Sequence, residues 1–230
     1  MTAVTRATGK PGHSGASLRA DAARNVAQIR AAAIAAFHGR GLSTPLEEIA
    51  AAAGVSKATI YNRFGGREGL IDAVIGELVA AEMHAIMDKA RQVADPWESI
   101  AGYVADRRDL QFREPAFTDA LLMTHPESRQ LAALANAATD ATVELVRRGH
   151  DAGVLRAGFT AGDLYYADIA NGLALRALPR PARADYDRRT GFFLDSLRAR
   201  LLRGAVRGRV WFFHRQAEAR AGAVRAQGAG

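Results

Sequence analysis

The stretch GVSKATIYNRFGGREGL, residues 54–70, gathers side chains that can hydrogen-bond to nucleic acid. The group consists of Lys57, Thr59, Tyr61 and Asn62, in a region otherwise rich in alanine. Ammonium, hydroxyl and amide groups are the ones that contact phosphate oxygens and base edges in DNA. We therefore interpret this stretch as a short helix that reads DNA.

A helical wheel divides the proposed helix into two faces. At about 100° per residue, Ile60 and Phe64 fall on an inner face, whereas Ala58 and Asn62 point away from it. A small, polar outer face can enter the major groove without steric conflict. The alternative is an ordinary solvated face, and for Asn62 and Arg63 it remains open. The positions that flank the outer face are Lys57, Thr59 and Tyr61.

The residues just before this helix predict a second short helix. Its apolar residues repeat at helical spacing between residues 46 and 53. Thr44 can cap its start, and Glu47 completes a Thr-x-x-Glu capping box. Gly54 can take the left-handed conformation that ends it, and Ser56 can cap the helix that follows. Two short helices joined in this way predict a helix-turn-helix.

The segment TPLEEIAAAAGVSKATIYNRFGGREGL resembles the DNA-binding domain of the TetR family of bacterial transcriptional regulators. The matching positions are Ile49-Ala50, residues 53–56, residues 59–61, Phe64, Arg67-Glu68 and Leu70. The likeness covers residues 24–80, and this combination is far more specific than a bare helix-turn-helix. Ala58 and Gly66 depart from the common family pattern, so relatives do not reveal the operator sequence.

The resemblance implies DNA contacts for eight residues. Base contacts are implied for Lys57, Ala58 and Asn62, phosphate contacts for Thr59 and Tyr61, and anchoring of the DNA backbone for Thr44 and Arg67. Arg63 is included as well, although its wheel position is nearer the inner face.

The distribution of charge agrees with a DNA-binding N-terminal part. The net charge is +6 for residues 1–67, −6 for residues 68–197 and +7 for residues 198–230. A basic segment next to an acidic one is typical of a nucleic-acid-binding module joined to another domain. Arginine enrichment itself carries little weight, because only three of the 31 basic residues are lysine and the composition fits a GC-rich codon bias.

The pattern along the chain predicts an all-α protein of about nine helices, with no alternation typical of strands. A helix with a wide apolar face is expected from Arg67 to about Val93, buried against two partners. The later helices are expected at residues 97–111, 116–124, 127–151, 161–178 and 183–203.

These patterns predict four segments. A disordered basic arm is expected at residues 1–20, the helix-turn-helix domain at 21–80, a regulatory domain for ligand binding and dimerisation at 81–203, and a basic tail that can be disordered at 204–230.

Composition and motifs argue against several classes of function. The chain has no cysteine, which removes disulfides and thiolate chemistry. We find neither an apolar run long enough to span a membrane nor a secretory signal, so the expected compartment is the cytoplasm. The sequence also lacks a zinc-protease motif, a phosphate loop and a nucleophile elbow, and it predicts no enzyme activity, cofactor or metal site.

The resemblance further implies that the acidic domain forms a homodimer and holds a small molecule. The best dimer helices are those at 161–178 and 183–203, which would meet their copies as a four-helix bundle. For each pocket candidate the alternative is a role in core packing or in a dimer contact. For His125 the alternative is a capping or surface role at a helix end. The pocket candidates are Trp97, Tyr103, Phe112, Phe117, Met123, His125, Tyr166 and Asn171.

The resulting hypothesis is a ligand-responsive regulator that binds double-stranded DNA. It would repress by binding a near-palindromic operator as a dimer, and a small-molecule inducer would release it. The alternative is an architectural protein that binds DNA without sequence preference. The sequence does not reveal the inducer, the target genes or the sign of regulation.

Overall fold

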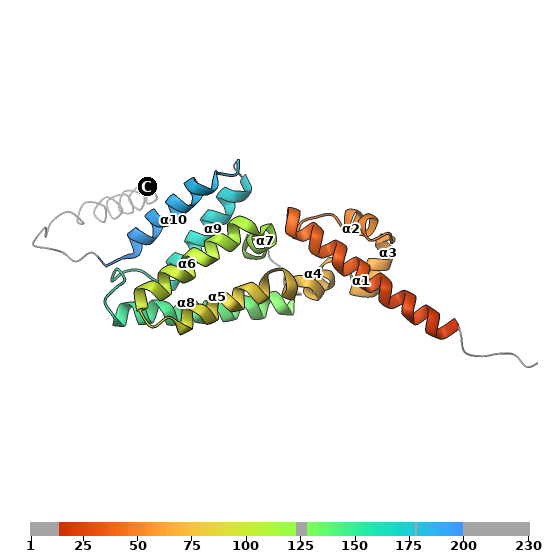
Figure 1. Ribbon diagram of the computed structural model, residues 1–230, viewed down its shortest axis with the longest axis horizontal. Helices are drawn as coiled ribbons and strands as arrows, with labels where there is room; N and C mark the ends of the chain where they lie inside the picture. Colours follow the sequence, from red (N-terminus) through yellow and green to blue (C-terminus); the bar gives the residue numbers. More distant parts are fainter. Residues whose placement is uncertain (1–13, 123–127, 178, 200–230) are drawn as a thin grey trace, which may run out of the picture. The chain divides into compact units, whose positions relative to one another are not determined.

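The computed structural model describes residues 14–122, 128–177 and 179–199, with side chains from residue 20 onward. Its elements, in chain order, are α1 (Ser14–Arg40), α2 (Leu46–Ala52), α3 (Lys57–Phe64), α4 (Arg67–Ile75), the π-helix η1 (Gly76–Ala80), α5 (Ala81–Gln92), α6 (Pro96–Arg113), α7 (Pro115–Leu122), α8 (Arg129–Asp151), α9 (Ala161–Ala177) and α10 (Arg183–Leu197) (Figure 1). Because α4, η1 and α5 are continuous, the described ranges hold nine helices, which confirms the predicted all-α fold.

Two helix ends differ from their predicted positions. Helix α1 begins at Ser14, seven residues before the expected start at Asp21, because the good helix formers alanine, leucine and arginine occupy four of residues 16–20. Helix α10 ends at Leu197, six residues before the expected end at residue 203. There the chain turns into an isolated antiparallel bridge between Leu155 and Arg198. The bridge places the buried Leu197 against the main core.

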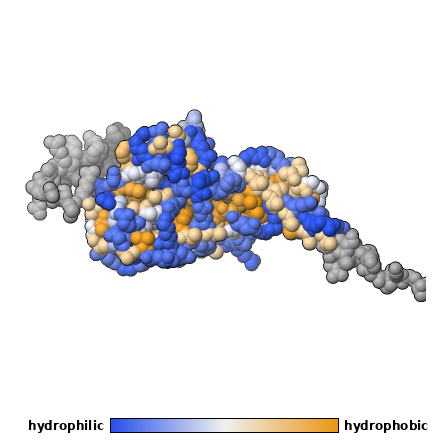
Figure 2. Space-filling view, in the orientation of Figure 1, coloured by the Kyte–Doolittle hydropathy of each residue, from blue (hydrophilic) through white to orange (hydrophobic). Residues whose placement is uncertain are grey.

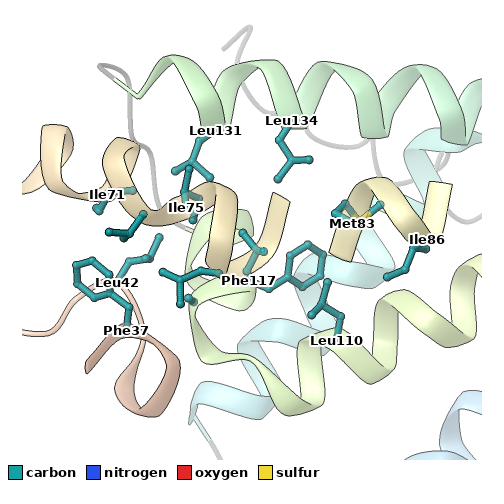
Figure 3. Packing of buried hydrophobic residues seen from close by; sticks show 14 of the residues in the cluster. Phe37, Leu42, Ile71, Ile75, Met83, Ile86, Leu110, Phe117, Leu131 and Leu134 are labelled. Carbon is teal, nitrogen blue, oxygen red and sulfur yellow. The ribbon is translucent and has the colours of Figure 1, made fainter. Parts of the chain in front are cut away.

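The N-terminal helices enclose a core that is built from their inner faces. Phe37 of α1 and the following Leu42 lie close to Ile71 and Ile75 in the close view (Figure 3). Helices α2 and α3 each bury an isoleucine at this core, Ile49 and Ile60. Hydrophilic side chains interrupt the hydrophobic patches on the visible outer face (Figure 2). This is the arrangement that amphipathic helices produce when one face of each is buried.

The continuous helix α4–η1–α5 buries residues along its whole length. It packs against α1, α6, α7 and α8, which confirms the expectation that its wide apolar face meets two sets of partners. Ile75 lies below Leu131 of α8, while Met83 and Ile86 lie near Leu110 of α6 (Figure 3). The boundary that the sequence predicts near residue 80 therefore falls inside one unbroken helix.

The backbone at Gly41, just after α1, lies very close to Asp119 of α7. Gly41 has φ +86°, a left-handed conformation that favours glycine, and a Cβ there would lie only 2.1 Å from Oδ2 of Asp119. Asp119 is buried and its Oδ1 lies 2.6 Å from Nη2 of Arg176. A substituted side chain would therefore meet a carboxylate that is already held in place.

Replacing Gly41 with alanine is expected to lower the free energy of unfolding by about 1–3 kcal/mol, from backbone strain and the conflict with Asp119. Gly39→Ala is the matched control, since a Cβ at Gly39 has no neighbour within 4 Å inside α1. That control should stabilise the protein by about 0.5–1 kcal/mol. Urea unfolding followed by circular dichroism measures both, and similar midpoints for the two variants would contradict the prediction.

Candidate nucleic-acid interface

Short-range contacts fix both ends of helix α3. Ser56 is its N-cap and accepts a hydrogen bond from the Thr59 amide at 3.2 Å. Gly65 ends the helix in the left-handed conformation and donates its N–H to Tyr61 O at 2.9 Å. Gly54 also has positive φ, as the turn between α2 and α3 requires. The turn of the predicted helix-turn-helix and the predicted N-cap of α3 are therefore confirmed.

The two faces of α3 differ in burial as the helical wheel predicts. Ile60 is fully buried and Phe64 is half-buried. Thr59 is half-buried, and its hydroxyl lies 2.9 Å from that of Ser56. Arg63 is exposed although its wheel position is nearer the inner face, because its long side chain reaches solvent from that position. The exposed residues of α3 are Lys57, Ala58, Tyr61, Asn62 and Arg63.

Lys57 is oriented by two neighbours on the exposed surface. Its Nζ donates to Glu47 Oε1 at 2.5 Å and lies 5.8 Å from the centre of the Tyr61 ring. The hydrogen bond to Glu47 raises the pKa of Lys57, and the same bond lowers the pKa of Glu47. Lys57 thus remains a cation at the start of α3, and it has further N–H donors for a phosphate or a base beside the one that binds Glu47.

Thr44 is not the cap of α2 that the sequence predicts. Its side chain is buried, and its hydroxyl donates to Gly41 O at 2.9 Å. The N-cap of α2 is Pro45, without a side-chain cap, so the predicted capping box is wrong. The reason is that both of its partners are engaged elsewhere, Thr44 with the preceding turn and Glu47 with Lys57. A buried hydroxyl is not presented to a phosphate.

Arg67 links the first turn of α4 to the loop before α2. Its Nη1 donates to Leu42 O at 2.7 Å, and the side chain is half-buried. A guanidinium has five N–H donors, so this bond leaves others for a phosphate. Arg67 therefore keeps a geometry that is compatible with anchoring the DNA backbone.

The part of the chain that carries this geometry also matches a family model. Residues 29–74 match the bacterial regulatory proteins of the tetR family. The chain carries the DNA-binding domain of the TetR family of transcriptional regulators. The match spans α1 to α4, which are the helices that build the helix-turn-helix and its core.

Solved structures show that the TetR-like fold extends beyond this domain. The ketosteroid transcriptional regulator KstR2 of Mycobacterium tuberculosis is 17% identical, with a TM-score of 0.56 over 75% of this chain and 94% of that one. PfmR from Thermus thermophilus is 24% identical, with a TM-score of 0.53 over 73% and 94%. The fatty acid degradation regulator FadR from Bacillus halodurans is 17% identical, with a TM-score of 0.52 over 76% and 97%. At these identities the likeness establishes the fold alone. No curated protein sequence matches the chain.

The aromatic and polar residues predicted to line a ligand pocket do not come together around one cavity. Met123 and His125 lie outside the described residues. Tyr166 is 72% exposed on α9. The other five candidates are engaged in contacts between helices or in the core, and their place in a ligand pocket stays a prediction.

Those five residues are held by specific contacts. The hydroxyl of Tyr103 lies 3.0 Å from that of Thr142, and Asn171 donates to Tyr186 at 2.8 Å. The five residues and their surroundings are Trp97 beneath the Arg198 guanidinium, Tyr103 against α8, Phe112 with its ring centre 4.8 Å from that of the tilted Tyr186 ring, Phe117 in the main core, and Asn171 between Gln111 and Tyr186.

A different cavity lies among α6, α7, α8 and α9 and has a volume of about 290 Å³. We call it the regulatory cavity. Small residues form most of its wall, so most of its lining does not stand out in the sequence. Its lining consists of Arg107, Leu121, Ala135, Ala138, Thr139, Thr142, Ala161, Gly162 and Tyr165. A larger hollow of about 640 Å³ between α1 and α2 is more open and lies in the DNA-binding part, so it is the weaker candidate for an effector.

Proposed function

We propose that this TetR-family regulator is a repressor that binds a near-palindromic operator as a homodimer and leaves it when a small molecule binds. The observation that carries the proposal is the exposed polar face of α3, held rigidly by Ile60, Ser56 and Gly65. The described residues contain no helix that is long and apolar enough to cross a membrane. The proposed compartment is the cytoplasm, where a bacterial regulator meets its DNA.

In the proposed complex α3 lies in the major groove. Lys57, Ala58 and Asn62 would contact bases, because they lie on its exposed face. Thr59 and Tyr61 would contact phosphates beside the groove. Arg63 and Arg67 extend the same basic surface. Thr44 is not part of the proposed set, because its hydroxyl is already bonded inside the protein.

The proposed dimer forms through α9 and α10. Tyr166 and Phe192 are 72% and 65% exposed, and Tyr165 and Leu173 are also exposed. Large apolar side chains concentrated on two neighbouring helices are typical of a surface that a second subunit covers. Pairing with the same helices of a second copy would bury them in a four-helix bundle. A dimer would then present two α3 helices to two half-sites.

The proposed switch couples the regulatory cavity to α4. Asp72 of α4 accepts hydrogen bonds from the Ser128 hydroxyl and, at 3.3 Å, from the Arg129 amide at the start of α8. Helix α8 also supplies four residues to the cavity wall. A ligand that favours another position of α8 would therefore favour another position of α4, and with it another spacing of the two α3 helices.

A gel shift with the DNA that flanks the protein's own gene tests this proposal. Tight, salt-sensitive binding to one sequence supports a regulator, whereas equal affinity for random duplex supports the architectural alternative. Mapping the bound sites across the genome would then give the operator, its symmetry and the neighbouring genes. An operator without two related half-sites would contradict binding as a symmetric dimer.

Two neighbouring substitutions in α3 should separate phosphate contact from base reading. Tyr61→Phe should weaken binding to every sequence by about three- to tenfold, with little change in salt dependence, because the lost hydroxyl is uncharged. Asn62→Ala should instead change the preferred sequence, with a discrimination of about 1–3 kcal/mol at one base pair. Competition gel shifts with single-base operator variants measure both effects. An unchanged ranking of operator variants with Asn62→Ala would show that Asn62 does not read a base.

A further inference from the structure

We propose that the regulatory cavity binds a small organic anion, such as a carboxylate with an apolar body, and that Arg107 holds its charged group. The inference rests on the proposed function, which places the effector in this cavity, and it adds the chemical class of that effector.

The first reason is an excess of buried positive charge beside the cavity. Arg107, Arg108 and Asp168 are only 6%, 7% and 2% exposed. Nη2 of Arg107 lies 2.8 Å from Oδ2 of Asp168, and the Arg108 guanidinium lies 4.2 Å from the centre of the Phe193 ring. One buried carboxylate therefore stands against two buried guanidiniums. A second anion would balance this group.

The hydrogen bonds of the group are also incomplete. Nε of Arg107 and Nε of Arg108 are buried and have no hydrogen-bond partner among the described residues, and the same is true of both carboxylate oxygens of Asp168, which meet Arg107 only as an ion pair. Burial raises the pKa of Asp168, although the two arginines oppose this effect. If Asp168 were protonated, it would no longer balance any of the positive charge of the two guanidiniums. Buried donors without partners are rare in native proteins and are often completed by a ligand or water.

The remaining wall of the cavity favours the same chemistry. Arg107 is its single charged residue among the lining side chains. The hydroxyls of Thr139 and Thr142 donate to carbonyls of their own helix, Ala135 O and Ala138 O, at 2.8 and 2.7 Å. A cation would add to the positive charge of this group. The carbonyl of a neutral molecule could accept a hydrogen bond from Arg107, but it would leave that charge unbalanced. An anion satisfies both requirements.

The start of α9 adds a second favourable group. Ala161 and Gly162, the first two residues of this 17-residue helix, line the cavity. Backbone N–H groups and the helix dipole at such a position attract negative charge. Asp163 accepts bonds from the amide and hydroxyl of Thr160 and lines a different hollow, so it does not occupy the regulatory cavity. Leucine and alanine on the rest of the wall suit an apolar body.

Matched ligands that differ only in charge test the proposal. The probes are 3-phenylpropanoate, 3-phenylpropanamide and 3-phenylpropylamine, with octanoate, octanamide and octylamine as a second body. Calorimetric titration near neutral pH is expected to show each carboxylate binding at least about tenfold more tightly than its amide. The amines should not bind. Equal or tighter binding of the amides, or no binding of either carboxylate up to about 10 mM, would overturn the proposal.

Two variants locate the binding site. The double variant Arg107→Met, Asp168→Leu removes the ion pair and leaves only Arg108, so that the net charge of the buried group is unchanged. It should reduce the preference for carboxylate over amide to less than about twofold. Arg107→Lys keeps the charge but loses donors, so it should weaken carboxylate binding several-fold and leave amide binding unchanged. This second variant decides the matter if the first does not fold. A carboxylate preference that is unchanged in the folded variants would place the anion elsewhere.

The DNA assay separates this inference from the proposed function. If the protein binds its operator specifically but its cavity binds the amides more tightly, the proposal of an anionic ligand is overturned. The repressor proposal then still stands. Absence of specific operator binding would overturn the repressor proposal whatever the probes show. Release of operator DNA by a carboxylate, but not by its amide, would support both.

Discussion

Asp168→Ala is expected to lower the free energy of unfolding by about 3–5 kcal/mol, one of the largest effects of any single substitution in this protein. Asp168 is almost fully buried, and its carboxylate faces Arg107 at 2.8 Å. Without it, two guanidiniums would remain in the interior with no carboxylate to balance them. Breaking a buried pair from one side is costly because the remaining charge has lost both its hydration and its partner.

Denaturant unfolding followed by circular dichroism measures this effect. The control is Asp187→Ala on α10, which also removes an aspartate that pairs with an arginine, Arg183 at 2.9 Å, but on an exposed surface. Its unfolding midpoint should hardly change, because exposed ion pairs contribute little. The double variant Arg107→Met, Asp168→Leu should recover most of the loss. Equal midpoints for the two aspartate variants would show that Asp168 does not stabilise the fold by compensating the buried arginines.

Ile60→Ala is expected to destabilise the DNA-binding part by about 2–5 kcal/mol and to abolish operator binding. Ile60 is fully buried and is the anchor that holds α3 to the core formed with α2 and α4. The helix has only eight residues, too few to be stable without such packing. Loss of the anchor would therefore remove the ordered surface that meets DNA, although no proposed contact residue is changed.

Asn62→Ala provides the matched control for Ile60→Ala, two positions further along the same helix. Asn62 is exposed, so its removal should leave thermal stability nearly unchanged while it alters the preferred sequence. Gel shifts and thermal unfolding on the three proteins give the comparison. An Ile60→Ala variant that retains operator affinity at the temperature of the assay would contradict the role of this anchor.

The helix-turn-helix could be predicted from sequence because its signals are local. Gly54, Ser56 and Gly65 each fix a turn or a cap through contacts within a few residues, and the spacing of Ile60 and Phe64 sets the buried face. The error at Thr44 has a simple cause, since the sequence contains a valid capping box but does not show that Lys57 competes for Glu47. Ten residues separate that lysine from its partner.

The regulatory cavity could not be predicted in the same way. Its charged group pairs Arg107 with Asp168, 61 positions apart in the chain and linked by no periodic pattern. Most of its lining is alanine, threonine and glycine, which in sequence look like ordinary helix surface. Large aromatic residues were the more conspicuous candidates, yet Tyr103 and Phe117 are buried in the packing between helices. A void is defined by what neighbouring helices leave empty, and only the assembled fold reveals that.

The π-helical turn at Gly76–Ala80 has a consequence for the length of the helix that joins the two parts. Helices α4 and α5, on either side of this turn, bury residues about four positions apart. In a regular α-helix of about 3.6 residues per turn, each step of four residues moves the buried position by about 40° around the helix axis. A π turn holds more residues per turn and shifts the phase in the opposite direction. The extra residue thus keeps Ile75 and Met83 in the same continuous core, as both are buried there. Removing one residue from this helix would therefore rotate the DNA-binding helices about its axis relative to the regulatory cavity.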